Sequence, residues 1–461
     1  MSKPLNIALI GLGNVGTGVA RILLEQSERM TRRAGRAIQL RRVVVRDVHR
    51  PRDVILPVGV VTDDLQSVIR DPEIEVAVEL MGGIHPPREV VLSLLDAGKD
   101  VVTANKALLC ECGDELFARA RELGRTIAFE AAVAGGIPII AAVGQAMAAN
   151  QIVGIQAILN GTSNYILTEM LLRQQSYAAA LRQAQELGYA EADPSLDVNG
   201  TDAAQKLGLL AQLAFGRRAT TNSFHVSGID RIEQADIKYA TELGYTIKLL
   251  ASARLIPPVP SPPSAEERVR VRGSSSGQEE APGLLAMSVR PTLIRQDQPL
   301  AQIHGPYNAI LLDGDVVGTV WYSGRGAGQM PTASAVTADI IDLAIGRAQL
   351  TFPRLDLWND TPAVPVMPEH AVSSRFYLRL LVEDRPHVMA DLTHILGQHR
   401  ISLASVIQPE APEVEAGEPT TTVPLIIMTH RTTAGQLAAA ERELQAAPAV
   451  RAPLMTLAVA D

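Results

Sequence analysis

The sequence predicts an α/β protein of three domains: a doubly wound parallel sheet, a mixed α+β domain and a C-terminal ferredoxin-like βαββαβ module. The chain has 461 residues, and at roughly 150 residues per domain this length indicates about three domains. Apolar runs alternate with helical patterns in the first part, and two β-α-β patterns close the chain. We expect the domains at 1–130, 131–352 and 374–461, with a linker at 353–373, and we expect the last helix of the second domain to pack back on the first domain.

The composition indicates aliphatic cores and excludes several classes of protein. Hydrophobic residues make up 47% of the chain and aromatic residues only 3%. The net charge of −8 argues against a nucleic-acid binder with a basic surface. The two cysteines, Cys110 and Cys112, cannot staple a chain of this size, and no charge-free apolar stretch reaches membrane-spanning length. We therefore expect a cytoplasmic protein that binds neither nucleic acid nor membrane.

The first domain opens with a nearly continuous apolar run at 5–10, as expected for a parallel strand buried on both faces. A helical pattern follows at 17–26. Further strands are expected at 40–45, 58–61, 75–80, 100–104 and 126–129, and further helices at 88–95 and 115–123. This alternation is typical of a doubly wound sheet.

Between the first strand and its helix lies the sequence GLGNVG, residues 11–16. Gly11 allows the tight turn, Gly13 lets the backbone approach a pyrophosphate, and Gly16 permits close packing of the helix on the strand. The following helix N-terminus offers N–H groups to phosphates. The motif therefore predicts a Rossmann-like dinucleotide-binding domain.

Residues at the ends of two further strands indicate which dinucleotide binds and where the substrate lies. NAD enzymes usually place an acidic residue at the tip of the second strand, but Arg46 stands there with Arg50 close behind. This favours a 2′-phosphate and hence NADP, while Asp47 keeps NAD open as the alternative. Lys106 closes a later strand, whose carboxyl end faces the ligand crevice. Lys106 is expected to touch cofactor and substrate, with a solvated surface lysine as the alternative.

The second domain has longer helices and later strands. Helices are expected at 177–187 and 202–213, and strands at 286–289, 309–312 and 316–321. An insert at 257–283 is rich in Pro, Ser and Gly and cannot bury enough apolar surface to order itself. We expect a mobile surface excursion, with a rigid polyproline arm as the alternative.

The densest polar cluster lies at 188–206, where four carboxylates precede a helix. Asp202 and Lys206 are four residues apart and share one face of that helix. An ordinary ion pair within the helix is therefore the alternative to a catalytic role. Lys206 heads an apolar run, which places its amine in a partly dry cleft suited to acid–base chemistry. Carboxylates such as Glu191 and Asp197 would suit an amino-bearing substrate.

The last domain has the compact βαββαβ order. Strands are expected at 375–382, 401–408, 421–429 and 454–459, and helices at 387–398 and 433–444.

Four blocks of the sequence resemble the homoserine dehydrogenase family. They are TANKA at 103–107, NGTSNYIL at 160–167, the segment 184–206, and GRGAGQMPTAS at 324–334. The resemblance covers about residues 5–350 in the family's order, and VEDRPHVMA at 382–390 resembles the first turn of an ACT regulatory domain. Two departures are Arg325, where the family often has proline, and the insert.

The resemblance implies NAD(P)H-dependent reduction of L-aspartate 4-semialdehyde to L-homoserine, a step that feeds threonine, methionine and isoleucine synthesis. Lys206 matches the family's proton donor, with Asp202 as its partner, and Lys106 matches the lysine near nicotinamide and substrate. Glu191 and Asp197 match positions that bind the substrate amine, beside Asp202 and Lys206.

The same resemblance assigns cofactor and cation positions. The cofactor positions are Gly11, Leu12, Gly13, Asn14, Val15, Gly16, Arg46, Thr103, Lys106, Gly326 and Gly328. The positions for a monovalent cation, Na⁺ or K⁺, are Glu130, Val133, Gly135 and Ile137. Because ACT modules bind amino acids between paired copies, feedback control by L-threonine and a homodimer or homotetramer are also implied.

Two other functions stay open. A phosphorylating semialdehyde dehydrogenase would need Cys110 or Cys112 as its nucleophile, but no His lies nearby in the sequence to activate either thiol. A purely regulatory amino-acid sensor would carry a vestigial nucleotide site. The intact glycine motif, Lys106 and Lys206 argue against that reading.

Overall fold

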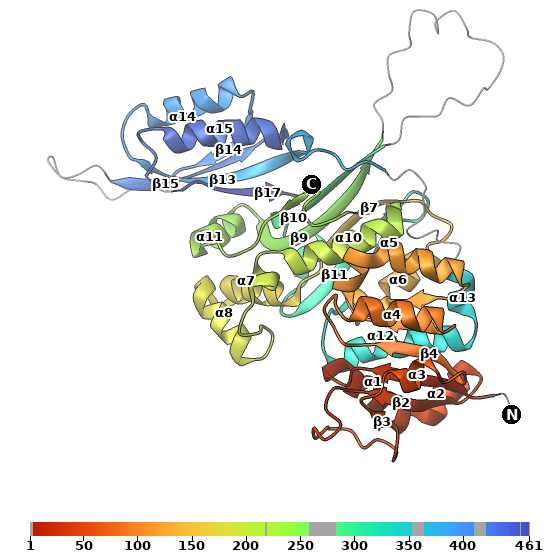
Figure 1. Cartoon of the computed structure of the whole chain (residues 1–461). Coiled ribbons are helices and arrows are strands. Elements are labelled where there is room, and N and C mark those ends of the chain that lie inside the picture. The colour runs from red at the N-terminus through yellow and green to blue at the C-terminus, as the bar shows by residue number, and fades with distance from the viewer. Residues whose placement is uncertain are drawn as a thin grey trace, which may run out of the picture.

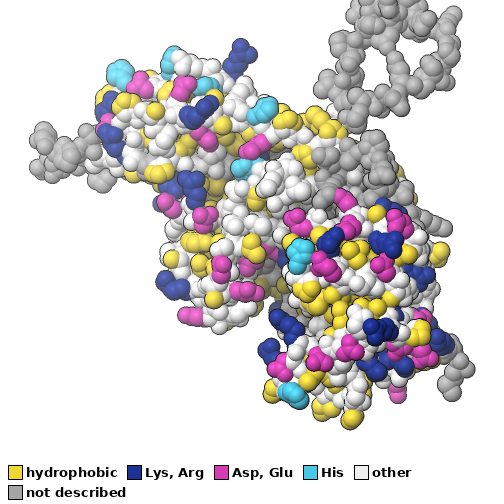
Figure 2. Space-filling view, in the orientation of Figure 1, with side chains coloured by type: hydrophobic (Ala, Val, Ile, Leu, Met, Phe, Trp, Pro, Cys, Tyr) yellow, Lys and Arg dark blue, Asp and Glu magenta, His cyan; other side chains and the backbone are white. Residues whose placement is uncertain are grey.

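The structure is a computed structural model that describes residues 3–216, 219–257, 283–352, 364–409, 421–451 and 453–460. Three parts follow one another in space, with the N-terminal domain at one end, the C-terminal module at the other and the second domain between them (Figure 1). Charged side chains of both signs are interspersed over the face in Figure 2. No helix in the described ranges combines the length and apolar character needed to cross a bilayer.

The first domain is built on a six-stranded parallel sheet in the order β3-β2-β1-β4-β5-β6. Its strands are β1 (Leu5–Ile10), β2 (Ile38–Val44), β3 (Val61–Thr62), β4 (Ile74–Glu79), β5 (Asp100–Thr103) and β6 (Ile127–Ala128). All of β1 is buried, as expected for a central strand covered on both faces. The order reverses between β1 and β4, and such switch points bind ligands in doubly wound sheets. The predicted fold class is confirmed.

The helices of the first domain are α1 (Asn14–Glu25), α2 (Ser27–Ala34), α3 (Gln66–Ile69), α4 (Pro87–Asp96) and α5 (Lys106–Glu122). A helix of the second domain, α12 (Gln329–Ala344), returns and packs on α1. The approach is close at Gly18, where an added Cβ would lie 2.9 Å from the Cβ of Ala333. The first sheet is therefore covered partly by chain that comes more than 300 residues later.

The second domain contributes five neighbouring strands, in the order β12-β11-β7-β9-β10, to a larger sheet, and β8 pairs with β10. The strands are β7 (Ile152–Ile158), β8 (His225–Val226), β9 (Tyr245–Ile256), β10 (Leu284–Arg295), β11 (Tyr307–Gly314) and β12 (Gly318–Arg325). The helices are α6 (Ile139–Ala141), α7 (Gly161–Arg173), α8 (Tyr177–Glu186), α9 (Ser195–Val198), α10 (Thr201–Phe215), α11 (Gln234–Glu242) and α13 (Arg347–Thr351). Helix α10 packs against both β9 and α5, so it lies where the first two domains meet.

Several elements differ from the sequence expectations. The third strand is Val61–Thr62 rather than 58–61, and Val58 is exposed. Helix α1 begins at Asn14, inside the glycine motif, rather than at residue 17. Elements without a counterpart among the sequence expectations are α2, α3, α6, α7, α9, α11, α13, β7, β8, β9 and β16. Helix α7 shows the reason, because nine consecutive residues of it are buried, polar ones included, so no exposed polar face creates a helical period.

The C-terminal module has the predicted βαββαβ order, with strands arranged β17-β13-β15-β14. Its elements are β13 (Ser373–Glu383), α14 (Val388–Gln398), β14 (Leu403–Ile407), β15 (Thr422–Thr429), β16 (Thr432–Thr433), α15 (Ala434–Ala446) and β17 (Met455–Val459). The inward residues of the sheet and both helices form a separate aliphatic core that includes Leu380, Leu392 and Ile427.

The module is joined to the second domain by a continuous sheet, which the sequence reading did not anticipate. β17 pairs in parallel with β10 through Thr292 with Ala458 and Leu293 with Val459. The described part of the predicted linker, 364–373, is also attached to β10, since Leu285 donates to Pro365 O at 2.8 Å. The predicted insert falls between β9 and β10, and its residues 258–282 lie outside the described residues.

A buried ion pair reinforces this junction. Asp236 of α11 is fully buried, and Arg379 of β13 donates to its two carboxylate oxygens at 2.6 and 3.1 Å. The Tyr377 hydroxyl donates to the same carboxylate at 3.3 Å. Burial and the neighbouring Asp236 carboxylate raise the pKa of Tyr377. The phenol therefore stays a donor to this pair.

Replacing Asp236 by Ala should lower the free energy of unfolding by about 3 kcal/mol, because the largely buried Arg379 then keeps, among the described residues, only the exposed Glu233 carboxylate, 3.0 Å away, as an ionic partner. As a matched control, Asp297→Ala removes the exposed partner of Arg295 and should change the value by less than about 1 kcal/mol. Urea unfolding followed by circular dichroism measures both variants. Equal losses in the two would contradict the role assigned to Asp236.

Candidate active site

The glycine motif forms a tight turn between β1 and α1. Gly11 has φ of +101°, and an added Cβ would lie 2.7 Å from Leu80 O of the neighbouring strand end. A Cβ on Gly16 would collide with the Gly11 carbonyl. Gly13 differs, because nothing lies within 4 Å of its Cβ position. The turn thus needs Gly11 and Gly16 for its own packing, whereas the space at the Cβ position of Gly13 is open.

The loop before α12 lies beside this turn. Gln329, the first residue of α12, donates to Asn14 Oδ1 at 3.1 Å. Gly328 has φ of +123° and is exposed, whereas Gly326 is buried, and a Cβ there would collide with the Asn308 side-chain amide. The exposed positions Gly13, Asn14 and Gly328 therefore lie near one another at the N-terminus of α1.

An arginine, rather than an acidic residue, follows the end of β2. Arg46 is exposed just beyond the last residue of β2. The Asp47 carboxylate turns back and accepts from His49 N at 2.9 Å. Arg52 donates to the carbonyls of Asp47 and Arg50, at 2.5 and 2.7 Å, and so holds the loop closed. The acidic side chain next to Arg46 is engaged within its own turn.

Lys106 is placed by a chain of buried contacts at the end of β5. Thr103 donates to the fully buried Glu79 at 2.7 Å, and Asn105 N donates to Thr103 Oγ1 at 3.0 Å. Asn105 caps α5, so Lys106 is the first residue of that helix. Its side chain is about one-third exposed, and its Nζ lies 3.3 Å from Asp202 Oδ1. The lysine at this strand end is therefore an interdomain contact.

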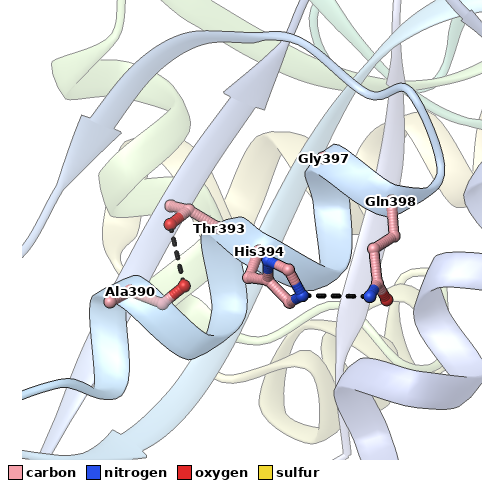
Figure 3. Close-up of a pocket in the computed structure, with 5 residues that line it drawn as sticks. All are labelled: Ala390, Thr393, His394, Gly397 and Gln398. Carbon is pink, nitrogen blue, oxygen red and sulfur yellow. Dashed lines mark hydrogen bonds between the residues drawn. The ribbon is translucent and has the colours of Figure 1, made fainter.

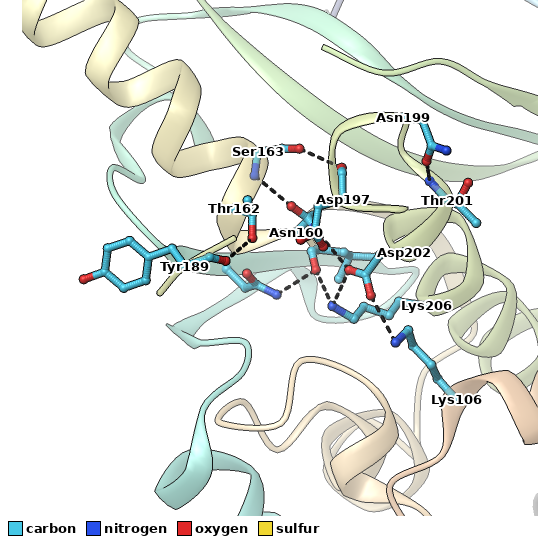
Figure 4. Close-up of polar contacts among 12 residues, drawn as sticks. Lys106, Asn160, Thr162, Ser163, Tyr189, Asp197, Asn199, Thr201, Asp202 and Lys206 are labelled. Atoms are coloured by element: carbon cyan, nitrogen blue, oxygen red, sulfur yellow. Dashed lines mark hydrogen bonds and ion pairs between the residues drawn. The ribbon is translucent and has the colours of Figure 1, made fainter. Parts of the chain in front are cut away.

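Asp202 and Lys206 form a buried pair on α10. Lys206 Nζ donates to Asp202 Oδ2 at 2.7 Å and to Leu159 O at 2.8 Å, and the two side chains are only 11% and 12% exposed. Figure 4 shows Lys206 and Lys106 both pointing at Asp202. Burial opposes ionisation of this carboxylate, but the two ammonium groups outweigh it and lower the pKa of Asp202 to about 2. The pair is thus not an ordinary solvent-exposed helix ion pair.

Asp197 joins the cluster, whereas Glu191 stands apart from it. Asn160 Nδ2 donates to Asp197 Oδ1 at 2.7 Å, and burial, together with the nearby Asp202, raises the pKa of Asp197. Glu191 is exposed, and its backbone carbonyl accepts from Gln185 at 3.2 Å. The structure therefore brings four predicted side chains together: Lys106, Asp197, Asp202 and Lys206.

Sequence reasoning missed the side-chain amides that support this cluster. Asn160, at the end of the strand-to-helix connection, reaches both Asp197 and Asp202. Asn308 Nδ2 donates to Leu159 O at 2.9 Å, the carbonyl that also receives Lys206. An Asn preceding a helix signals an N-cap, but nothing local in the sequence indicates which distant carboxylates it reaches.

The cation positions surround a buried turn after β6. Both Glu130 oxygens accept backbone N–H groups, from Ile140 at 2.9 Å and Ala141 at 2.8 Å, and burial raises the pKa of Glu130 to about 7. In the described part of the chain, no hydrogen bond ends on the buried carbonyls of Val133 and Gly135. Among the residues that the structure describes, no three His, Cys, Asp or Glu side chains lie together in a group that could hold a metal ion.

A hollow on the C-terminal module is separate from this site. It lies along α14 and is lined by Ala390, Thr393, His394, Gly397 and Gln398 (Figure 3). Gln398 hydrogen-bonds to His394 at 2.9 Å within the helix. These groups are on a different domain from the lysines and carboxylates, so the hollow is no part of the candidate active site.

Comparison with known proteins matches all three domains. Family models described as the homoserine dehydrogenase NAD-binding domain, homoserine dehydrogenase and the ACT domain match residues 11–130, 138–341 and 376–449. Homoserine dehydrogenase of Pseudomonas aeruginosa is 39% identical over 466 residues, covering 99% of each chain. The chain belongs to the homoserine dehydrogenase family. It is therefore an oxidoreductase with a nicotinamide-dinucleotide-binding domain and an ACT domain.

Solved structures of the homoserine dehydrogenase family agree. The crystal structure of a homoserine dehydrogenase from Thiobacillus denitrificans has a TM-score of 0.84 at 38% identity, covering 100% of this chain and 99% of that chain. A hyperthermophilic archaeal homoserine dehydrogenase in complex with NADPH shares the fold at 24% identity, with a TM-score of 0.58 over 74% of this chain and 97% of that chain.

The thiol alternative receives no support from the geometry. Cys110 Sγ donates to Gln205 O at 3.4 Å, and burial raises the pKa of Cys112. A catalytic cysteine needs the opposite shift, toward the thiolate.

The two structural glycines and Gly13 should respond differently to substitution. Gly16→Ala should lower the free energy of unfolding by about 1–3 kcal/mol through overpacking. Gly13→Ala should leave stability nearly unchanged but weaken NADPH binding about ten-fold, because its methyl group enters the open space. Thermal unfolding and NADPH fluorescence titration measure these effects. Normal NADPH affinity in Gly13→Ala would show that the dinucleotide does not approach this glycine.

Proposed function

We propose that this enzyme reduces L-aspartate 4-semialdehyde to L-homoserine with NADPH, supplying the synthesis of threonine, methionine and isoleucine. The observation that carries the proposal is the buried Asp202 between Lys206 and Lys106, at the meeting point of the dinucleotide domain and α10. Family membership supports the same reaction. Initial rates of NADPH oxidation with the semialdehyde test it directly.

The site residues suit a hydride transfer to an aldehyde. Bound NADPH supplies the hydride. As the carbonyl oxygen gains negative charge, an N–H of Lys206 within hydrogen-bond reach donates to it and then delivers the proton. Asp202 orients the Lys206 side chain through their 2.7 Å ion pair, and Lys106 adds a second positive group beside the same carboxylate.

Carboxylates on the other side of the cluster suit the substrate ammonium. Asp197 is tied to Asn160 within the cluster, and we assign it the substrate amine. Glu191, exposed on the preceding turn, contributes to the same subsite when the substrate is bound. An ammonium between these two groups gains charge-assisted hydrogen bonds.

The dinucleotide positions fit NADPH. Gly11 to Gly16, with Leu12 and Val15 between them, hold the pyrophosphate at the N-terminus of α1. Arg46 suits a 2′-phosphate, and Asp47 is engaged with His49 N, so NADP is favoured over NAD. We assign Thr103, Lys106 and Gly326 to the nicotinamide end, and Gly328 to the pyrophosphate end beside Asn14.

The buried turn after β6 suits a monovalent cation. Its ligands would be the oxygens of Glu130, Val133, Gly135 and Ile137. Two buried carbonyls without a hydrogen-bond partner among the described residues support this, because hard cations bind carbonyl oxygen. Of the four, the Ile137 carbonyl already accepts Ile139 N at 2.8 Å. The cation would therefore share that oxygen.

Regulation and assembly belong to the same proposal. The ACT domain supports feedback control, with L-threonine as the effector. Trp321, Val316 and Val317 are exposed on and beside edge strand β12, and these apolar groups support a homodimer or homotetramer. Cys110 and Cys112 are thiols and form no disulfide, which supports a location in the reducing cytoplasm.

Lys206→Ala should lower kcat by about two orders of magnitude or more, because the developing alkoxide loses its proton donor. The NADPH dissociation constant should stay unchanged. Lys238→Ala, on the exposed face of α11, is the control and should keep full activity. Lys206→Met retains the side-chain volume if the alanine variant folds poorly. Near-normal turnover in either folded variant would move the donor role to Lys106.

Arg46→Asp should lower kcat/KM with NADPH by at least about ten-fold and leave kcat/KM with NADH unchanged or raised, because one charge-assisted contact to a phosphate is lost. Arg32→Asp changes the net charge equally on the exposed face of α2 and serves as the control. Steady-state kinetics with both cofactors measure the ratio. An equal loss with NADH and NADPH would remove Arg46 from cofactor selection.

A further inference from the structure

Asn160 lies at the centre of the candidate active site, although no step of the proposed reaction uses it. It is 4% exposed and forms the N-cap of α7, where its Oδ1 accepts from Ser163 N at 2.8 Å. Its Nδ2 donates to Asp197 Oδ1 at 2.7 Å and to Asp202 Oδ2 at 2.9 Å (Figure 4). One side-chain amide thus joins a helix start and two carboxylates.

The two carboxylates depend on this amide to different degrees. They come from different elements, α9 and α10, and two like charges in a partly buried site repel each other. Asp202 is balanced by Lys206 and Lys106. Burial and the charge of Asp202 raise the pKa of Asp197, and the hydrogen bond from Asn160 acts in the opposite direction. Removal of the Asn160 side-chain amide should therefore disturb the Asp197 carboxylate more than the Asp202 carboxylate.

The backbone on both sides of Asn160 is held by close contacts. Its neighbour Leu159 accepts Lys206 Nζ at 2.8 Å and Asn308 Nδ2 at 2.9 Å through one carbonyl. On the other side, a Cβ on Gly161 would lie 2.9 Å from Pro306 O, so the backbone is packed against a second segment. Residues 159–160 therefore hold Lys206, Asp197 and Asp202 through hydrogen bonds to one short and tightly packed backbone segment.

We propose that Asn160 is a positioning residue that holds the Asp197 carboxylate in place for the substrate ammonium and keeps it beside the Asp202–Lys206 pair. It acts through Asp197 and does not itself touch the reacting atoms. This inference rests on the proposed function, because it takes Asp197 as the group that receives the substrate amine.

The decisive variant is Asn160→Ser. Serine is also a good N-cap and preserves the start of α7, but its short hydroxyl cannot span both carboxylates. KM for L-aspartate 4-semialdehyde should rise about ten-fold, the size of one charge-assisted hydrogen bond, and kcat should fall by less. The NADPH dissociation constant should not change. Asn160→Asp puts a third carboxylate in place of the donor, so KM should rise further than in the serine variant.

A double-mutant cycle separates positioning from a purely structural role. In an Asp197→Asn background, Asn160→Ser should change KM by less than about two-fold, because there is no carboxylate left to hold. Ser176→Ala, which removes the N-cap of α8 on an exposed turn, is the control for cap loss and should lower Tm without changing KM.

Three results would overturn the proposal: an unchanged KM in Asn160→Ser, a ten-fold rise that persists in the Asp197→Asn background, or an equal loss of NADPH affinity. The single variant Asp197→Asn keeps the two proposals apart. If its KM rises while that of Asn160→Ser does not, the positioning role alone is wrong. If its own KM is unchanged, the amine subsite of the proposed function is wrong, and the role of Asn160 is overturned with it.

Discussion

The buried Asp202 carboxylate is the point on which the candidate active site depends. It faces Lys206 from its own helix and Lys106 from the first domain, at 2.7 and 3.3 Å. A buried charge is tolerated only when partners compensate its loss of hydration. The contact with Lys106 thus joins α10 to the dinucleotide domain within the candidate active site.

Close approaches also hold the turn after β6 against the end of β12. Gly136 N donates to Arg325 O at 2.9 Å, and a Cβ on Gly136 would collide with that carbonyl. The Arg325 guanidinium lies over the Tyr307 ring, 5.7 Å from its centroid. The chain then enters α12 and packs on α1. The side chain at residue 325 thus lies over an exposed aromatic ring.

The strand β10 connects the C-terminal module to the same region. It pairs with β17 of the module, and Ser227 N donates to Val289 O of β10 at 2.8 Å. The segment after Ser227 packs tightly on the turn between α9 and α10, because a Cβ on Gly228 would collide with Val198 O. A continuous path of backbone contacts thus runs from the module to the turn between α9 and α10, the helices that bear Asp197 and Asp202.

The sequence by itself determined the doubly wound sheet, the glycine turn, the βαββαβ module and the shared face of Asp202 and Lys206. Each of these is carried by short-range periodicity or by conformational limits on a few neighbouring residues. Tertiary structure alone decided that Asn160 reaches two carboxylates, that Lys106 meets Asp202, and that β17 extends the sheet of the second domain. Asn160 lies 37 and 42 residues from its two carboxylates, and Lys106 lies 96 residues from Asp202. Such contacts leave no period in the sequence, because they exist only once helices and strands from distant parts of the chain have packed.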